Sequence, residues 1–314
     1  MDQVLLFAIL GLGVGVLYAG VGIGLVTTYR GSGVINFGHA GFGLWGALVA
    51  DELRTSGTLV LPWPGPTAHI QLGGPQSVVV AVAIGTLSAT VLAALAYLGI
   101  FRFLQRRSVV AKILASIGLL TTLSALLENV FGAETRPGAP VLPSSPISLG
   151  ELSFPADRLW ALAVCIVVTA LLWAAYRYSV IGIAMRASVQ DDVAVTLAKW
   201  SPTVLGTVSW ATGAAVTALL CSLTAPVAGL NGGAVSLLIV PGLAAMLAAR
   251  LTSVVGGRCC GGRGSPWRSA VSIRSVGGSA LVADVGQRRR HERPAVPRDR
   301  GDARLRRPEA AVAR

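Results

Sequence analysis

Charged residues are scarce in this chain. Asp, Glu, Lys and Arg make up 13% of its 314 residues, whereas hydrophobic residues make up 53%. The mean hydropathy is +0.68. Several uncharged runs approach the roughly 20 residues that a membrane-spanning helix requires. This composition excludes an ordinary water-soluble domain and predicts a multi-pass integral membrane protein.

The chain also lacks the motifs of common catalytic and nucleotide sites. It contains no GxxxxGK(S/T) phosphate loop, no HExxH zinc motif and no GxSxG nucleophile elbow. Its four cysteines form no CxxC pair and no metal-ligand spacing. We therefore expect no catalytic residue, no metal and no cofactor. An intramembrane enzyme or a secondary transporter that uses His39 and Glu128 is the alternative, although no inverted repeat is convincing.

The net charge of +12 comes mostly from the C-terminal region. Residues 1–250 hold 12 Lys and Arg against 9 Asp and Glu, whereas residues 251–314 hold 14 against 5. In the body, basic residues lie in short connections between apolar runs, where they set orientation. The cluster Arg102, Arg106, Arg107 and Lys112 predicts a cytoplasmic loop, which places the N-terminus outside. Nucleic acid is excluded as a partner of the body.

An all-α bundle of about seven membrane segments is expected, one of them broken or re-entrant. In the first segment, the pairs Gly11/Gly15 and Gly20/Gly24 have the spacing that lets helices approach closely. The regular segments are predicted at Val4–Val26, Val78–Ile100, Ile113–Phe131, Leu159–Tyr176, Thr203–Leu223 and Ala234–Ala249.

The remaining segment, Arg30–Ala50, is the broken one. Its sequence, RGSGVINFGHAGFGLWGALVA, is rich in glycine and places Asn36 and His39 in an apolar stretch. Non-helical backbone is tolerated at membrane depth only where it is buried in protein or lines a cavity, and broken helices commonly form transporter pathways. We predict that Asn36 and His39 line a translocation pathway. The alternative is that they make ordinary hydrogen bonds between closely packed helices.

Two further features suggest function. Glu128 is the only acid well inside a predicted span, so it is either a pathway residue or a side chain that reaches the outer interface. In Gly182–Pro202, charged and apolar residues alternate at roughly helical spacing, which predicts a short amphipathic cytoplasmic helix. Such a helix can dock in a groove of a soluble partner or lie in the membrane interface.

Four stretches together resemble the branched-chain amino acid permease family of ABC transporters, over about residues 10–255. They are VINFGHAGFGLWGALVA, RSVVAKILASIGLL, GIAMRASVQDDVAVTLAKWSP and LLIVPGLAAMLAARLTS. The resemblance implies a permease subunit in the plasma (inner) membrane of a bacterium, forming the pathway for branched-chain or related amino acids. It implies as partners a second permease subunit, ABC ATPase subunits and an extracytoplasmic substrate-binding protein.

The resemblance also implies roles and departures for single residues. Gly182–Pro202 matches the segment that contacts the ATPase in that family. Two positions depart from the family pattern: Lys199 stands where a glycine is usual, and Glu128 stands where an amide is common. The residues of the ATPase-contacting segment that carry over are Arg186, Ala187, Asp191, Ala194 and Leu197.

The chain changes character after Val255. Residues 1–255 form the predicted permease domain; residues 256–314 contain no further span, and the 14 basic residues after 250 are all Arg. This tail is either a native disordered segment attracted to anionic membrane lipid, or the product of a reading-frame slip in a GC-rich gene. We favour the slip, because the resemblance stops there with a final span still expected. The product would then be a truncated, non-functional permease.

Overall fold

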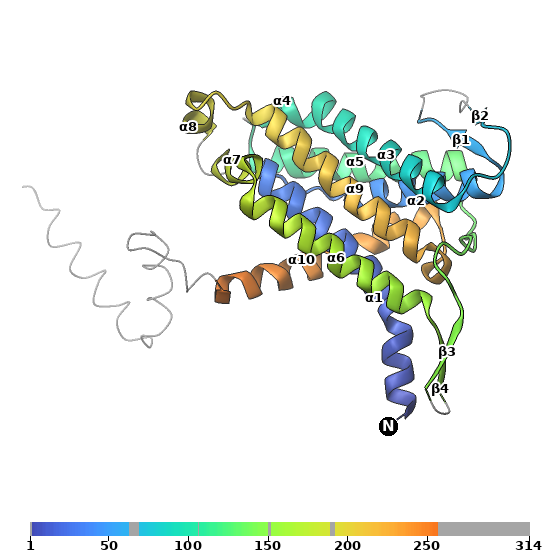
Figure 1. Ribbon diagram of the computed structural model, residues 1–314. Helices are drawn as coiled ribbons and strands as arrows, with labels where there is room; N and C mark the ends of the chain where they lie inside the picture. Colours follow the sequence, from blue (N-terminus) through green and yellow to red (C-terminus); the bar gives the residue numbers. More distant parts are fainter. Residues whose placement is uncertain (1, 63–68, 106, 150–151, 189–191, 257–314) are drawn as a thin grey trace, which may run out of the picture. The chain divides into compact units, whose positions relative to one another are not determined.

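Helices dominate the structure, as the long uncharged runs predict (Figure 1). The computed structural model describes residues 2–62, 69–105, 107–149, 152–188 and 192–256. The helices are α1 (Asp2–Ser32), α2 (His39–Thr55), α3 (Val78–Ala96), the π-helical η1 (Tyr97–Phe101), α4 (Arg102–Leu104), α5 (Val109–Phe131), α6 (Asp157–Tyr178), α7 (Val180–Ser188), α8 (Asp192–Leu197), α9 (Pro202–Ala228), the 3-10 turn η2 (Gly232–Ala234) and α10 (Val235–Gly256).

Two short antiparallel hairpins interrupt the helices. β1 (Thr58–Val60) pairs with β2 (His69–Gln71), and β3 (Pro146–Leu149) pairs with β4 (Leu152–Pro155). Both lie in connections that follow a long helix, and neither belongs to a larger sheet among the described residues. The structure is therefore a helix bundle with hairpin decoration.

Five helices of the described part are long and apolar enough to cross a membrane. The prediction of a polytopic all-α bundle is confirmed, but the count of seven is not. α2 has only 17 residues, and the apolar core of α10 covers Leu237–Leu247. The five candidate spans are Ile9–Ser32, Val78–Leu104, Val109–Phe131, Asp157–Tyr178 and Pro202–Val227.

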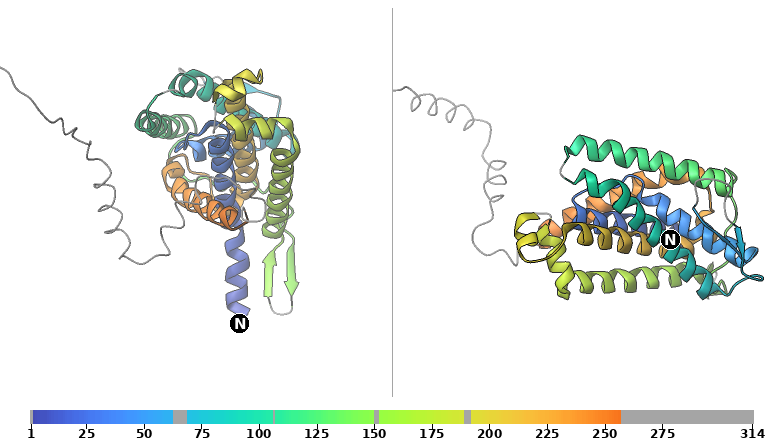
Figure 2. Two further views of the ribbon diagram at one scale, coloured as in Figure 1. Left: turned by 90° about the vertical axis from the view of Figure 1, so that its left-hand side faces the viewer. Right: turned by 90° about the horizontal axis from the view of Figure 1, so that it is seen from above.

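α9 is the central helix of the bundle. It packs along α1, α2 and α3, and α5 and α6 lie on opposite flanks of this group (Figure 2). The apolar window of α9 is 61% buried, against 17% for α5 and 11% for α6. Large apolar side chains such as Leu114 on α5 and Leu171 on α6 are exposed. Lipid tails can cover such a surface at no cost, which fits flanking helices of a membrane bundle.

The two ends of the bundle differ in charge. At one end, α1 and α6 finish while α5 and α9 begin, and α7 and α8 lie beside them (Figure 1). The opposite end carries the hairpins and the ion pairs Arg136–Glu52 (3.3 Å) and Arg158–Asp157 (3.0 Å). The predicted orientation, with the N-terminus outside, rests on this asymmetry. The end at which α1 and α6 finish is called the basic end, because it holds Arg30, Arg102, Arg107, Lys112, Arg177 and Lys199.

The close helix contact that the glycine spacing of α1 predicts is observed for one of the two pairs. A Cβ on Gly20 or Gly24 would lie 2.9 Å or 2.1 Å from side-chain atoms of α9, so the two helices touch there. Gly11 and Gly15 have no described atom within 4 Å of such a Cβ. The spacing identifies a face that can pack closely, but it does not show how far along the helix the partner extends.

The predicted amphipathic helix is two short helices. α7 ends at Ser188 and α8 begins at Asp192, while residues 189–191 lie outside the described residues. Ala184 and Met185 of α7 cluster with Val195 of α8 and Leu205 of α9. Folding the two helices against each other buries this small apolar core, which one straight helix could not do.

Candidate functional site

The interruption predicted in Arg30–Ala50 lies between α1 and α2. Helix α1 ends at Ser32, residues 33–38 are bend, turn or irregular backbone, and α2 begins at His39. Gly33 has φ 66, and its N–H donates to the Tyr29 carbonyl at 2.8 Å. This is the left-handed position after a helix end, where glycine avoids the cost that a side chain would add. The broken segment is thus observed.

The break returns the chain to the middle of the bundle. Gly38 lies against Leu119, near the middle of α5, with 3.0 Å from an ideal Cβ to the leucine side chain. His39 contacts Thr217, near the middle of α9. From there α2 runs to the opposite end, where Arg54 donates to the Ala139 carbonyl at 2.8 Å. The irregular backbone is therefore enclosed by protein, as it must be at membrane depth.

Asn36 stabilises the turn into α2. Its Oδ1 accepts the Gly38 N–H at 3.0 Å, and its backbone carbonyl accepts the His39 N–H at 3.2 Å. An asparagine that bonds the backbone two residues on is a common turn device. The side chain is fully buried, and its Nδ2 has no hydrogen-bond partner among the described residues. The side-chain oxygen of Asn36 therefore has a hydrogen bond, whereas its side-chain nitrogen has none among the described residues.

His39 makes one hydrogen bond and leaves one nitrogen free. Its Nε2 lies 2.9 Å from Thr217 Oγ1, which is also 3.0 Å from the Gly213 carbonyl and 3.1 Å from the Gly20 carbonyl. Carbonyls only accept, so the single hydroxyl proton goes to one of them and Nε2–H donates to the hydroxyl oxygen. In a neutral ring that carries its proton on Nε2, Nδ1 is an acceptor, and Nδ1 has no partner in the described part of the chain.

Close contact between α1 and α9 holds this arrangement together. A Cβ on Gly24 would lie 2.1 Å from both His39 Nε2 and Thr217 Oγ1, and one on Gly213 would lie 2.8 Å from the Gly24 carbonyl oxygen. One turn nearer the basic end, Ser209 Oγ donates to a carbonyl of α1 at 2.7 Å. At the level of His39, the contact between α1 and α9 leaves no space for an additional side-chain atom.

An aromatic cluster lies between His39 and the basic end. Trp210 is fully buried, with its ring centroid 4.5 Å from that of Phe101, 5.4 Å from Tyr97 and 6.4 Å from Phe42. Trp210 Nε1 donates to Ser32 Oγ, at the last residue of α1, at 3.1 Å. Tyr97 and Phe101 are the first and last residues of η1, and π-helical turns are frequent at functional sites. These rings separate His39 from the basic end.

Two cavities lie on either side of this closed centre. One, of about 210 Å³, is lined by Leu44 and Cys221, each about one turn from His39 and Thr217 respectively. The other, of about 230 Å³, opens at the basic end and is lined by Gly33, Gln105, Lys112, Ser188 and Pro202. Cavities thus lie on both sides of the level that holds the buried polar side chains of Asn36 and His39.

Comparison with known families decides what kind of protein has this geometry. The family model described as branched-chain amino acid transport system / permease component matches residues 7–274. The chain belongs to this family. No curated protein and no solved structure matches it. This permease keeps its family match beyond Val255, so the expectation that the resemblance ends there is wrong. The family is one of transport permeases, not of enzymes.

The other predicted residues of the permease lie apart from Asn36 and His39. Glu128 is exposed in the last turn of α5, with its Oε1 3.0 Å from the position of a Cβ on Gly233. In the predicted ATPase-contacting segment, Arg186 belongs to α7 and Ala194 to α8. Asp191 lies outside the described residues, Ala187 is exposed on α7, and Leu197 is 80% exposed on α8.

Thr217 and Trp210 of the permease were not predicted. Ser209 and Thr217 are eight residues apart and therefore share one face of α9. That polar pair in an apolar run was the available signal for Thr217. No sequence signal pointed to Trp210, because a tryptophan in a membrane span commonly lies either in the core or at the membrane interface.

Proposed function

We propose that this permease is the membrane-spanning subunit of an ABC importer, and that branched-chain or related amino acids cross it at the level of Asn36 and His39. Membership of the family supports the transport role. The observation that carries the site is the pair of buried polar atoms, Asn36 Nδ2 and His39 Nδ1, that have no partner among the described residues.

The energetic cost of leaving these two atoms without a hydrogen-bond partner supports a functional interpretation. Leaving a buried donor or acceptor unpaired costs about 1–3 kcal/mol each, and the cost is higher in the absence of nearby water. A zwitterionic amino acid offers what both atoms need: its carboxylate accepts from Nδ2, and its ammonium donates to Nδ1. Separation of α1 from α9 would open this level to one cavity or the other.

Energy for this movement comes from partner ATPases, since the sequence has no phosphate loop of its own. We infer that they dock on α7 and α8, where Ala187 and Leu197 are exposed. The basic-end cavity is lined by Ser188 of α7, Pro202 of α9 and Gly33 of the break. A displacement of α7 therefore reaches the pathway directly, and it can bias one of two packings of the spans.

The remaining partners and the location follow from the same proposal. A second permease subunit would complete the pathway, and an extracytoplasmic binding protein would deliver and select the amino acid. The assembly would lie in the inner membrane of a bacterium, with the basic end in the cytoplasm.

The pathway is tested by uptake into vesicles that contain the assembled transporter. Asn36→Ala and His39→Ala should each lower uptake at least about tenfold, the value of one hydrogen bond to a charged group. Asn129→Ala, which removes an exposed amide from α5, is the matched control and should transport normally. Normal uptake in both pathway variants at normal expression would remove Asn36 and His39 from the route.

Coupling is tested by ligand-stimulated ATP hydrolysis. Arg186→Glu, Asp191→Arg and Leu197→Asp should each abolish stimulation while the purified permease stays monodisperse, because the changes fall on the proposed docking segment rather than the spans. Retention of full stimulation in all three variants would exclude this segment as the ATPase contact.

A second candidate is a truncated, non-functional permease, favoured by the change of composition after Val255. Translation of the DNA in the other two frames after codon 255 decides between them. A run of about 20 apolar residues in either frame supports a slip. Its absence from both frames leaves the native tail.

A further inference from the structure

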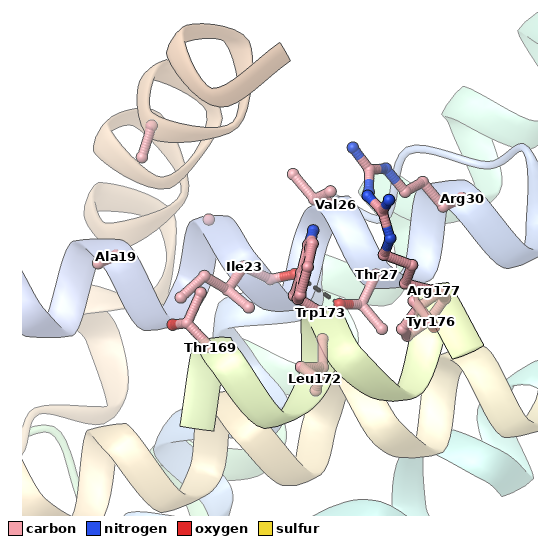
Figure 3. A pocket seen from close by; sticks show the side chains of 12 residues that line it. Ala19, Ile23, Val26, Thr27, Arg30, Thr169, Leu172, Trp173, Tyr176 and Arg177 are labelled. Carbon is pink, nitrogen blue, oxygen red and sulfur yellow. Dashed lines mark hydrogen bonds between the residues drawn. The ribbon is translucent and has the colours of Figure 1, made fainter. Parts of the chain in front are cut away.

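A third cavity lies on the flank of the bundle, away from the pathway. It has a volume of about 490 Å³ and is lined by residues of α1, α6 and α10 (Figure 3). Ile23 and Val26 of α1 and Leu172 of α6 form apolar walls, and Ala245 of α10 closes one side. Trp173 is 56% exposed, so the cavity is reached from the lipid side rather than from the pathway.

The cavity is amphipathic along its length. Arg30 and Arg177 rise at the same end of it, beside Trp173 (Figure 3). Its wall continues along α1 to Ala19, eleven residues away, which is roughly 16 Å at 1.5 Å per residue. Both arginines lie in the last turn of their helices, at the basic end. The cavity therefore has a cationic mouth at interface level and an apolar interior.

The two arginines have no acidic partner within the described structure. Its ion pairs are Arg136–Glu52 and Arg158–Asp157, both at the opposite end. The Arg177 guanidinium lies 5.2 Å from the centroid of the Trp173 ring, which holds it at the mouth of the cavity. Two cations at the same end of a cavity, neither with an acidic partner among the described residues, favour an anion from outside the chain.

We propose that this cavity binds an anionic phospholipid of the leaflet at the basic end, with its phosphate between Arg30 and Arg177 and one acyl chain along α1. Arginine matches phosphate geometry through paired N–H donors. Basic pockets between membrane helices bind anionic head groups. The two arginines at its mouth and the apolar walls below them match the head group and the chain of such a lipid, whereas a helix of a second copy would leave both charges without a counterion.

Lipid quenching of Trp173 tests the proposal. The full chain is reconstituted in phosphatidylcholine vesicles with small amounts of phosphatidylglycerol brominated on its acyl chains, which quenches nearby indoles. The difference between the wild type and Trp173→Phe isolates the signal of Trp173. We expect saturable quenching by brominated phosphatidylglycerol and only proportional quenching by brominated phosphatidylcholine.

Variants then separate charge from shape. Arg30→Gln and Arg177→Gln should each raise the half-saturating lipid fraction about fivefold. Arg102→Gln, which removes an exposed arginine of the same end outside the cavity, should leave it unchanged. Thr169→Phe fills the cavity from its exposed wall, keeps both arginines and should abolish saturation.

Several results would overturn the proposal. Equal quenching by the two lipids would make the cavity an ordinary lipid contact. Absence of saturable quenching would mean that another occupant, such as a second copy, covers it. An unchanged response when Arg30→Gln and Arg177→Gln are combined in one chain, or displacement of the lipid by millimolar inorganic phosphate, would exclude a lipid site built on these two charges.

Discussion

Gly24→Ala is the sharpest perturbation of the site, because it adds one methyl group at the contact between α1 and α9. That methyl would lie 2.1 Å from His39 Nε2 and from Thr217 Oγ1, far inside van der Waals contact. The neighbours are a packed helix and a buried ring, so neither can move away without opening the seam. The same substitution at Gly15 meets no described atom within 4 Å.

The two variants should change the free energy of unfolding in opposite directions. At either position of α1, alanine in place of glycine gains about 1 kcal/mol of helix propensity. At Gly24, overpacking costs about 1–3 kcal/mol, and loss of the His39–Thr217 hydrogen bond costs about 1 kcal/mol more. Gly24→Ala should therefore be destabilised by about 1–3 kcal/mol, whereas Gly15→Ala should gain about 1 kcal/mol.

Thermal unfolding of the purified protein in detergent measures the difference. At about 2–4 °C per kcal/mol, the melting temperatures of the two variants should differ by several degrees. Uptake should fall in Gly24→Ala and stay normal in Gly15→Ala. If the two variants melt together, the close contact at Gly24 does not exist in the protein, and the arrangement of His39 inferred from it is wrong.

Two further substitutions test the surroundings of the site. Lys199 has φ 64, a backbone conformation that costs a residue with a side chain about 1 kcal/mol. Lys199→Gly should therefore raise the melting temperature by a few degrees. The matched control is Lys112→Gly, which places glycine inside helix α5 and should lower the melting temperature. Trp210→Ala should destabilise the protein by about 3–5 kcal/mol in thermal unfolding, because it removes the ring that three other aromatic side chains contact; an unchanged melting temperature would show that the aromatic cluster is not formed.

The spans could be predicted from the sequence because apolar length is a local property. The same holds for the break, since the glycines and Asn36 act on the backbone within a few residues of themselves. Lys199 is an example: the resemblance leads us to expect a glycine at this position, and the structure gives Lys199 the left-handed backbone that glycine favours.

Contacts between distant segments could not be predicted. Thr217 meets His39 across 178 positions of sequence, and no local pattern contains that pairing. Gly11 and Gly15 have the same spacing as Gly20 and Gly24, but only the second pair meets α9 closely. The split of Gly182–Pro202 into α7 and α8 likewise depends on Leu205 of α9, which lies outside the segment.

The start of α2 in the middle of the bundle has an electrical consequence. A helix N-terminus carries roughly half an elementary positive charge, and Gly38 offers no side-chain cap to it in the described structure. The backbone at the start of α2 thus makes this buried level electropositive without a Lys or Arg in the first turn of the helix. Positive ends of short helices exclude protons and metal cations from membrane pores. On the pathway proposed above, this helix end would oppose leakage of sodium, potassium and protons and so preserve the membrane voltage, while a carboxylate could still approach.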